Sequence, residues 1–450
     1  MDQTFMEKKP IVPLVVKMSL PIVVSMIITA LYNIVDSYFV AKISEDAMTA
    51  LSLVFPLQNI TNAAGIGFGV GVNAAVSFYM GARRNDSASR SAVLGIIYSI
   101  LHGIILGLIC IFSIKPFLSF FTDNSAITKY GLDYFYIVMA FSPALTLGMC
   151  LEKIIQSTGK MKTTMICMLV GAVSNIILDP IFIFGYLEMP AMGVKGAALA
   201  TGIGQVLSLI SYYVVFRKVK LPVKLKLGHK NEDKITYRLY LVGIPATLNL
   251  ALPSFMITAL NSILSAFSTS YVLILGVYYK LQTFIYFSIS GIVQGIRPLV
   301  GYNYGARKKN RVMGIFKVTL LASIFIMIIG TILCMVIPDK LIDLFTDNSE
   351  TIVLGKTCLR IISLGFIISA LSVVISGVFE GLGMGISSLI ISLIRYLLII
   401  FVAFIMSKLI GVKGVWWSFP ITEVIASLVS VIIFLKSFVL KNDDIEDIEL

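Results

Sequence analysis

Two aspartates with polar neighbours stand inside long apolar runs of the sequence. Asp36 follows Asn33 by three residues and Asp179 follows Asn175 by four, so each pair shares one face of a helix. Thr201, early in the next apolar run, adds a hydroxyl. Carboxylate, amide and hydroxyl oxygens are hard donors, suited to a dehydrated small cation or to a shared proton. The sequence therefore predicts an ion site in the N-terminal half of the chain.

Other ionisable residues also fall within or close to apolar runs, where insertion of a charge costs about 2.5–3.5 kcal/mol. Residues with an expected polar or structural role are Glu152, beside Lys153, and Glu380 and Glu423. Residues expected to form ion pairs between helices are Arg297, Arg360 and Arg395.

The elements that carry these residues are predicted to be membrane-spanning helices. Hydrophobic residues make up 58% of the 450 residues and charged residues 13%, against roughly 45–50% and 25% in soluble domains. Apolar runs of this length cross a hydrocarbon core of about 30 Å as helices, which satisfy their own backbone hydrogen bonds. The expected spans are 14–41, 48–79, 91–114, 131–156, 163–187, 193–216, 237–264, 271–302, 312–337, 354–380, 386–409 and 414–438.

The distribution of basic residues predicts the orientation of these spans. Lys and Arg gather in one set of connections, above all in the loop 217–236, while the opposite set is poorer in them. By the positive-inside rule, this loop and both termini are expected to be cytoplasmic, in a multi-pass protein of the cell membrane. The net charge of +12 is then mainly a signal of this topology. It is also expected to give some affinity for anionic membrane lipids. Nucleic-acid binding is not expected, because aromatic residues are nearly absent from the loop.

An internal repeat divides the chain into two halves. The segment Phe121-Thr122-Asp123-Asn124-Ser125 recurs as Phe345-Thr346-Asp347-Asn348-Ser349, and this pair of segments defines the offset of the repeat. At the same offset Gly81-Ala82-Arg83 matches Gly305-Ala306-Arg307, Leu57-Gln58 matches Leu281-Gln282, and Pro21 matches Pro245. Six spans per repeat give both halves the same orientation, as in transporters with parallel repeats. The expected units are an N-lobe (1–216), a basic linker (217–236), a C-lobe (237–440) and an acidic tail (441–450).

The acids of the N-terminal half are not repeated in the C-terminal half. At the offset of the repeat, Asp36 corresponds to Leu260. The segment around Ser407, which corresponds to the segment of Asp179, contains no acid. The predicted ion site therefore belongs to the N-lobe alone.

Transport driven by an ion gradient fits these features better than catalysis. The sequence carries no ATP-binding cassette, no metal-ligand motif and no nucleophile–base motif, so neither an enzyme activity nor a cofactor is expected. A site between two symmetric lobes suits alternating access.

Three segments of the chain resemble the multidrug and toxic compound extrusion (MATE) transporters. The resemblance rests on Asn175-Ile176-Ile177-Leu178-Asp179-Pro180, on Gly193 to Thr201, and on Pro298 to Ala306. It implies an all-α membrane protein of twelve helices in two six-helix lobes around a V-shaped central cavity, acting as a monomer. It also implies export of cationic, amphipathic drugs in exchange for Na⁺ or H⁺. Carried over by motif, the residues of the coupling site, a candidate Na⁺ site, are Asp36, Asn175, Asp179 and Thr201.

Aromatic residues and methionine near the expected cavity would supply adaptable contacts for the cargo. Candidate residues of the substrate cavity are Tyr32, Asn33, Met256, Gln282, Phe284, Tyr286 and Arg297. The alternative is a flippase for lipid-linked oligosaccharides in the same superfamily, which is expected to line its cavity with cations for a pyrophosphate. Arg297 and Arg395 keep that alternative open.

Overall fold

The computed structural model describes residues 4–218, 222–223, 234–345 and 348–439, and its regular elements are helices. The first half contains α1 (Phe5–Lys8), α2 (Ile11–Ala41), α3 (Glu45–Gly81), α4 (Asn85–Phe121), α5 (Ser125–Ala140), α6 (Ser142–Ser157), α7 (Met161–Phe184) and α8 (Val194–Lys218). The second half contains α9 (Ile235–Ser265), α10 (Thr269–Gly305), α11 (Lys309–Val336), α12 (Pro338–Asp343), α13 (Ser349–Ser363), α14 (Phe366–Gly381), α15 (Gly385–Ile410) and α16 (Val412–Phe434), followed by a π-helical turn, Leu435–Val439.

The described helices agree with the twelve predicted spans when each of two bent pairs is taken as one span. Ten of the described helices are long and apolar enough to cross a membrane on their own. The other two spans are bent pairs: α5 and α6 meet at 49°, and α13 and α14 meet at 51°. The segments 131–156 and 354–380, each expected as one span, are therefore bent where their two helices meet. Many large apolar side chains point outward, including Phe112, Leu321 and Phe401, as expected for a surface covered by lipid.

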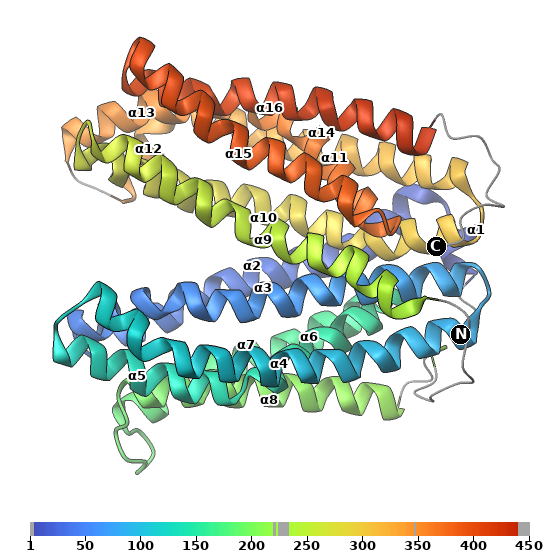
Figure 1. Ribbon diagram of the computed structural model, residues 1–450, viewed down its shortest axis with the longest axis horizontal. Helices are drawn as coiled ribbons and strands as arrows, with labels where there is room; N and C mark the ends of the chain where they lie inside the picture. The colour runs from blue at the N-terminus through green and yellow to red at the C-terminus, as the bar shows by residue number, and fades with distance from the viewer. Residues whose placement is uncertain (1–3, 219–221, 224–233, 346–347, 440–450) are drawn as a thin grey trace.

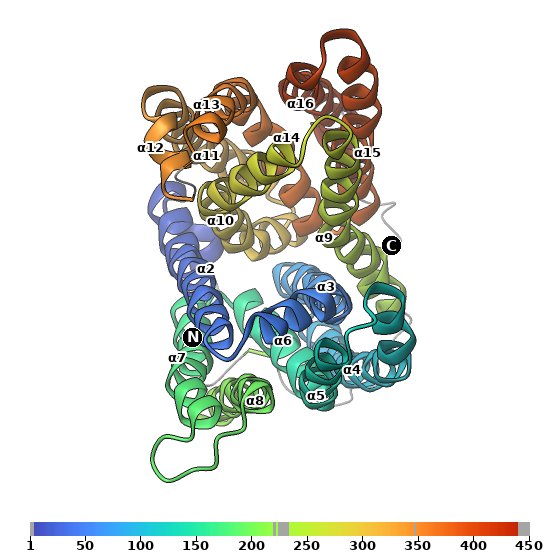
Figure 2. The same cartoon turned by 90° about the vertical axis from the view of Figure 1, so that its left-hand side faces the viewer.

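The helices form two lobes that lie side by side (Figures 1 and 2). Helix α2 packs against both α7 of its own lobe and α10 of the other, and α9 packs against both α15 and α3. Figure 2 places α2 and α9 at opposite sides of the junction between the lobes. They begin the first and second repeats, so each repeat contributes its first long helix to the junction.

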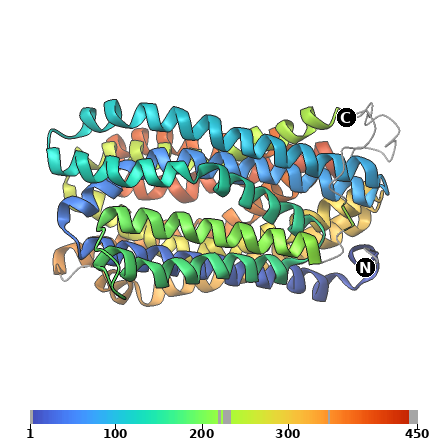
Figure 3. The ribbon, with the colours of Figure 1, turned by 90° about the horizontal axis from the view of Figure 1, so that it is seen from below.

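The lobes are in closest contact at the end of the molecule where α1 and the end of α16 lie (Figure 1). Figure 3 shows α1 at the same end. We call this the terminal end. A Cβ atom added to Gly71 would lie 2.2 Å from the carbonyl oxygen of Leu239, and one added to Gly295 would lie 2.6 Å from the Cα of Ser19. Such approaches require glycine, because any side chain would meet backbone atoms. These contacts lie in the halves of the helices nearer to the terminal end.

Helix α1 links the two lobes at this closed end. The carbonyl oxygen of Met6 accepts hydrogen bonds from Asn303 (3.2 Å) and Arg311 (3.2 Å) of the C-lobe. The side chain of Met6 lies against Gly159 of the N-lobe. The predicted linker begins at the last residues of α8 and ends at the start of α9. Apart from 217–218, 222–223 and 234–236, it lies outside the described residues, as does the tail 441–450.

Candidate functional site

The two N-lobe aspartates lie close together on neighbouring helices. Asp36 is carried by α2 and Asp179 by α7, and their carboxyl groups are near enough to interact directly. Asp179 is fully buried, and Oδ1 of Asp36 is buried with no hydrogen-bond partner. Both residues stand in the halves of their helices remote from the terminal end. The pair can therefore share a proton or accept a cation on the side of the molecule away from the closure.

Asn175 joins Asp179 to the next helix. With its amide oriented to satisfy both ends, its nitrogen donates to Oδ2 of Asp179 (3.2 Å) and its oxygen accepts from Oγ1 of Thr201 (3.3 Å). Asn175 is one helical turn from Asp179, and Gly204 on α8 lets the two helices approach closely: a Cβ there would lie 3.3 Å from the Cβ of Asn175. The structure thus brings together Asp36, Asn175, Asp179 and Thr201.

A cavity of about 200 Å³ opens beside this cluster. Its lining includes Tyr32, Asn175 and Thr201, together with Glu152 and Gln205. Oε1 of Gln205 is buried without a hydrogen-bond partner. A buried acceptor without a donor is costly, so the unpartnered oxygens of Gln205 and Asp36 suit a bound cation. The fit to Na⁺ rests on these hard oxygen donors.

Sequence reasoning missed three residues of this region: Gln58, Tyr134 and Gln205. The buried side chain of Tyr134, on α5, lies beside Gln58, on α3, and near Asp36. Gln58 belongs to the repeated Leu-Gln pair, and its counterpart Gln282 was placed in the candidate cavity. The repeat was therefore a signal that pointed to Gln58.

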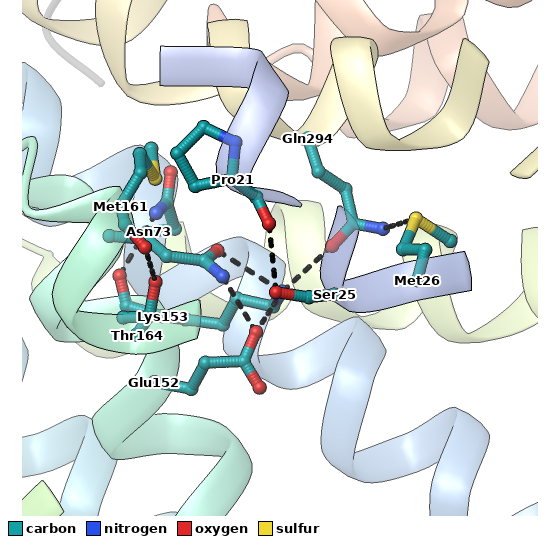
Figure 4. A network of polar contacts seen from close by, with 10 residues as sticks. Pro21, Ser25, Met26, Asn73, Glu152, Lys153, Met161, Thr164 and Gln294 are labelled. Atoms are coloured by element: carbon teal, nitrogen blue, oxygen red, sulfur yellow. Dashed lines mark hydrogen bonds and ion pairs between the residues drawn. The ribbon is translucent and has the colours of Figure 1, made fainter. Parts of the chain in front are cut away.

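Glu152 and Lys153 form part of a polar network between the lobes (Figure 4). Nζ of Lys153 donates to Oε1 of Glu152 (2.9 Å), to Oε1 of Gln156 (3.2 Å) and, across the junction, to Oε1 of Gln294 on α10 (2.9 Å). Gln294 in turn donates to the sulfur of Met26 (3.3 Å). Lys153 is buried, so its charge depends on these partners.

Replacing Lys153 with Met is expected to destabilise the protein by about 3–5 kcal/mol, because Glu152 then keeps a poorly solvated charge without its partner. The double variant Lys153→Met with Glu152→Gln should recover most of this loss, since no uncompensated charge remains. Thermal unfolding of the purified protein in detergent measures both. A double variant no more stable than the single one would show that the ion pair is not what stabilises this junction.

Two arginines of the C-lobe form ion pairs with glutamates. Arg297 of α10 pairs with Glu380 of α14, and Nε of Arg395 on α15 lies 2.7 Å from Oε1 of Glu423 on α16. The expected ion pairs thus form for two of the three arginines. The third, Arg360, instead donates to the carbonyl oxygen of Met335.

The remaining candidates for the substrate cavity do not lie together in one cavity. Arg297 lines a second cavity, between the lobes. Tyr286 does not line that cavity, and its hydroxyl shares a hydrogen bond with the hydroxyl of Ser369 (2.8 Å). Neither cavity includes the exposed Asn33 and Phe284, the half-buried Gln282, or the buried Met256 among its lining residues.

Known proteins resemble the whole chain. The "Multidrug export protein MepA" of Staphylococcus aureus strain MSSA476 is 29% identical over 439 residues, which cover 95% of this chain and 94% of the relative. The protein of the same name from Staphylococcus haemolyticus strain JCSC1435 is 25% identical over 431 residues, with the same coverage.

Solved structures share the fold. A MOP superfamily transporter from Pyrococcus furiosus superimposes with a TM-score of 0.90 at 22% identity, covering 98% of both chains. A structure described as MATE in the bent conformation gives 0.91 at 23% identity, again covering 98% of both chains. The two six-helix lobes expected from the sequence are those of this fold.

The sequence model of the MatE family matches the chain twice, at residues 21–181 and 245–405. The two matches begin at Pro21 and Pro245, which correspond to each other in the internal repeat, and together they cover more than half of the chain. The chain therefore belongs to the MatE family of transporters.

Proposed function

We propose that this protein is a secondary active multidrug efflux transporter, which exports cationic amphipathic compounds by antiport with Na⁺ or H⁺. The observation that carries the proposal is the acid pair of Asp36, whose Oδ1 is buried without a hydrogen-bond partner, and the buried Asp179; the neighbouring Asn175 and Thr201 line a cavity. Charged groups inside a membrane protein mark ion pathways by default. The naming of the staphylococcal relatives as multidrug export proteins supports the choice of cargo.

The coupling ion and the drug compete for the acid pair, and this competition couples ion entry to drug export. Binding of Na⁺ or H⁺ neutralises the carboxylates and weakens their attraction for an organic cation, which then leaves. Release of the ion restores the negative charge and favours the next cation. The ion and the drug must prefer different conformations, because a ligand with equal affinity for both shifts nothing.

The closed terminal end supports alternating access. Under the proposed topology, with both termini cytoplasmic and the protein in the cell membrane, this end faces the cytoplasm. The acid pair then lies in the outer half of the protein, and export requires the lobes to separate at the terminal end. The two repeats of one chain supply both halves of the junction, so the unit of transport is the monomer, in contact with membrane lipids.

Energetics favours more than one coupling ion. Exchange of one Na⁺ for one monovalent drug moves no net charge, so the membrane potential, worth about 2.3 kcal/mol per charge per 100 mV, does not contribute. The ion gradient alone supplies about 1.4 kcal/mol per tenfold difference. Two carboxylates can receive two monovalent ions. A second ion would add one more contribution from the ion gradient and would also let the membrane potential drive the exchange.

The test is efflux of ethidium, an organic cation, from proteoliposomes that contain the purified protein. Three conditions are compared: an imposed Na⁺ gradient, an imposed H⁺ gradient, and neither. We expect efflux to accelerate under one of the gradients and to cease when that gradient is dissipated with an ionophore. Folded protein that leaves ethidium efflux unchanged under both gradients would contradict the proposal.

The flippase alternative is weaker. Its expected cationic lining is represented by Arg297 and Arg395, and each of these has a carboxylate partner within hydrogen-bond distance. A pyrophosphate would have to compete with both partners. The proposed activity is transport without chemical change of the cargo, so no catalytic role is assigned.

A further inference from the structure

The N-lobe cavity is elongated and leads from the acid pair toward the terminal end. Asn175, which donates to Asp179, and Thr201 line its outer end, whereas Glu152 and Tyr212 line its inner end. Thr201 and Tyr212 both belong to α8, and positions that far apart on a helix are separated by about 16 Å. The cavity measures about 200 Å³, below the roughly 300–1,000 Å³ of sites for drug-sized ligands. In this conformation it therefore suits small ions and water.

One face of α8 carries a polar stripe along this cavity. The four residues of the stripe are Thr201, Gln205, Ser208 and Tyr212. Their spacing places the side chains on one face of the helix, and all four line the cavity. Polar groups inside a membrane protein are costly and are typical of ion and proton pathways.

Two groups of this stripe are buried without a hydrogen-bond partner. Tyr212 is 2% exposed, and its hydroxyl oxygen has no partner within the described part of the chain. The same holds for Oε1 of Gln205. Because an unpaired buried polar group is costly, water or an ion in the cavity would stabilise both side chains.

Glu152 supplies an acid at the inner end of the cavity. Its Oε1 accepts hydrogen bonds from Nζ of Lys153 (2.9 Å) and from Nε2 of Gln156 (2.6 Å). Its Oε2 accepts no hydrogen bond from the residues that the structure describes, which leaves this oxygen for a cation in the cavity. The positive charge of Lys153 weakens the attraction of Glu152 for a cation. Weak binding is what an ion pathway requires, because each site must also release the ion.

The inner end of the cavity is tied to the junction between the lobes. Lys153, the partner of Glu152, donates to Oε1 of Gln294 on α10 (2.9 Å; Figure 4). Glu152 also lies near the end of α6 that leads to Gly159, against which Met6 packs at the terminal end. Separation of the lobes at that end would break the contact between Lys153 and Gln294 and open the space beside Glu152.

We propose that the N-lobe cavity is the passage through which the coupling ion leaves for the cytoplasm, and that Glu152 is a second ion site at its inner end. The ion, Na⁺ or H⁺, binds at the acid pair from outside and moves along the polar stripe of α8. It is released past Glu152 when the lobes separate at the terminal end. The proposal rests on the proposed antiport and adds a route and a site to it.

A side chain that fills the cavity tests the passage. Gly148 on α6 lines the cavity one helical turn before Glu152, and a Cβ atom added there would meet no atom within 4 Å. Gly148→Leu should therefore place its side chain in the passage.

Two rates are measured in proteoliposomes. The first is ethidium efflux under the gradient that drives the wild type, which also identifies the ion as Na⁺ or H⁺. The second is exchange of radiolabelled for unlabelled ethidium without an ion gradient. Efflux requires release of the coupling ion, whereas exchange carries the drug in both directions and does not. We expect Gly148→Leu to reduce efflux to its rate without a gradient and to keep exchange close to the wild-type rate.

The matched control is Gly276→Leu, at a glycine of α10 that is equally open and lines neither of the two cavities. It should leave both rates unchanged. A second variant, Glu152→Gln combined with Lys153→Met, removes the inner site without leaving one charge unpaired. It should slow gradient-driven efflux about tenfold or more while exchange continues, and it replaces Gly148→Leu if that protein does not fold.

Two results would overturn the proposal. Loss of both rates in folded Gly148→Leu protein would mean that the cavity receives the drug or supports the fold. Wild-type efflux in that variant would mean that the ion leaves by another route. Failure of the proposed function is distinct from both, because wild-type protein without gradient-driven efflux refutes the antiport itself, and the passage with it.

Discussion

Asp36→Asn is expected to abolish gradient-driven efflux. The substitution keeps the size of the side chain but removes the charge that a cation or proton would neutralise. Hydrogen bonds and contacts to charged groups contribute about 1.5–3 kcal/mol, so ion binding should weaken about 10- to 100-fold. The measurement is ethidium efflux from proteoliposomes, with and without the gradient that drives the wild type. The variant should show the same slow efflux under both conditions.

A matched substitution in the same lobe controls for the loss of an acid in general. Asp133 on α5 forms an ion pair with Lys195 (3.4 Å), and both side chains are partly exposed. Asp133→Asn should retain gradient-driven efflux, because a partly exposed ion pair of this kind contributes little. If Asp36→Asn responds to the gradient as the wild type does, the coupling site lies elsewhere.

Hydropathy was sufficient to predict the spans but not their shape. Long apolar runs reveal where the chain crosses the membrane, because each span must bury its backbone polar groups in helical hydrogen bonds. The breaks at Phe141 and between Ser363 and Phe366 leave no comparable trace in hydropathy. Pro143 follows the first break closely, while the second has Gly365. Proline and glycine also occur within unbroken helices here, so neither predicts a break by itself.

The candidate ion site was predictable because its residues combine a local pattern with a costly position. Asn175 and Asp179 share a helix face, and charged residues in apolar runs are few. Tyr134 and Gln205 reach the site because α5 and α8 pack against the other helices of the lobe. The periodicity of a single sequence does not reveal this packing.

The symmetry of the repeats conceals a chemical difference between the lobes. At the offset of the repeat, Asn73 corresponds to Arg297 and Gln156 to Glu380. In the N-lobe these positions carry amides, which contact the backbone oxygen and the ammonium group of Lys153. In the C-lobe they carry an ion pair. The sequence indicated that the arginine would be paired but did not identify its partner.

The closed terminal end is built from the same symmetry. A Cβ atom on Gly81 would lie 1.9 Å from the carbonyl oxygen of Tyr302, and one on Gly305 would lie 2.1 Å from that of Phe78. The two glycines correspond to each other in the internal repeat, as do Phe78 and Tyr302. The contact therefore repeats itself about the pseudo-two-fold axis, with α3 and α10 in backbone contact, as in a symmetric dimer interface.

Substituting Leu at both Gly81 and Gly305 is expected to open the terminal end. Overpacking costs about 1–3 kcal/mol at each site, so both together shift the balance between closed and open arrangements by roughly 30- to 10⁴-fold. Spin labels at Lys162 of the N-lobe and Asn310 of the C-lobe, both exposed, report the separation by double electron–electron resonance. The described native cysteines are buried, which favours labelling at engineered sites. The distance distribution should move to longer values, with loss of efflux.

Gly276 offers the control, since it lies in α10 and a Cβ added there would meet no atom within 4 Å. Gly276→Leu should leave the distance distribution as in the wild type. A second pair of labels at Ser125 and Glu350, at the opposite end of the molecule, distinguishes rocking from unfolding. Rocking shortens that distance while the first one lengthens, because two rigid lobes that pivot about a common junction move in opposite senses at their two ends. Simultaneous lengthening at both ends would mean that the lobes simply separate, and the glycine contact would then hold the molecule together without acting as a gate.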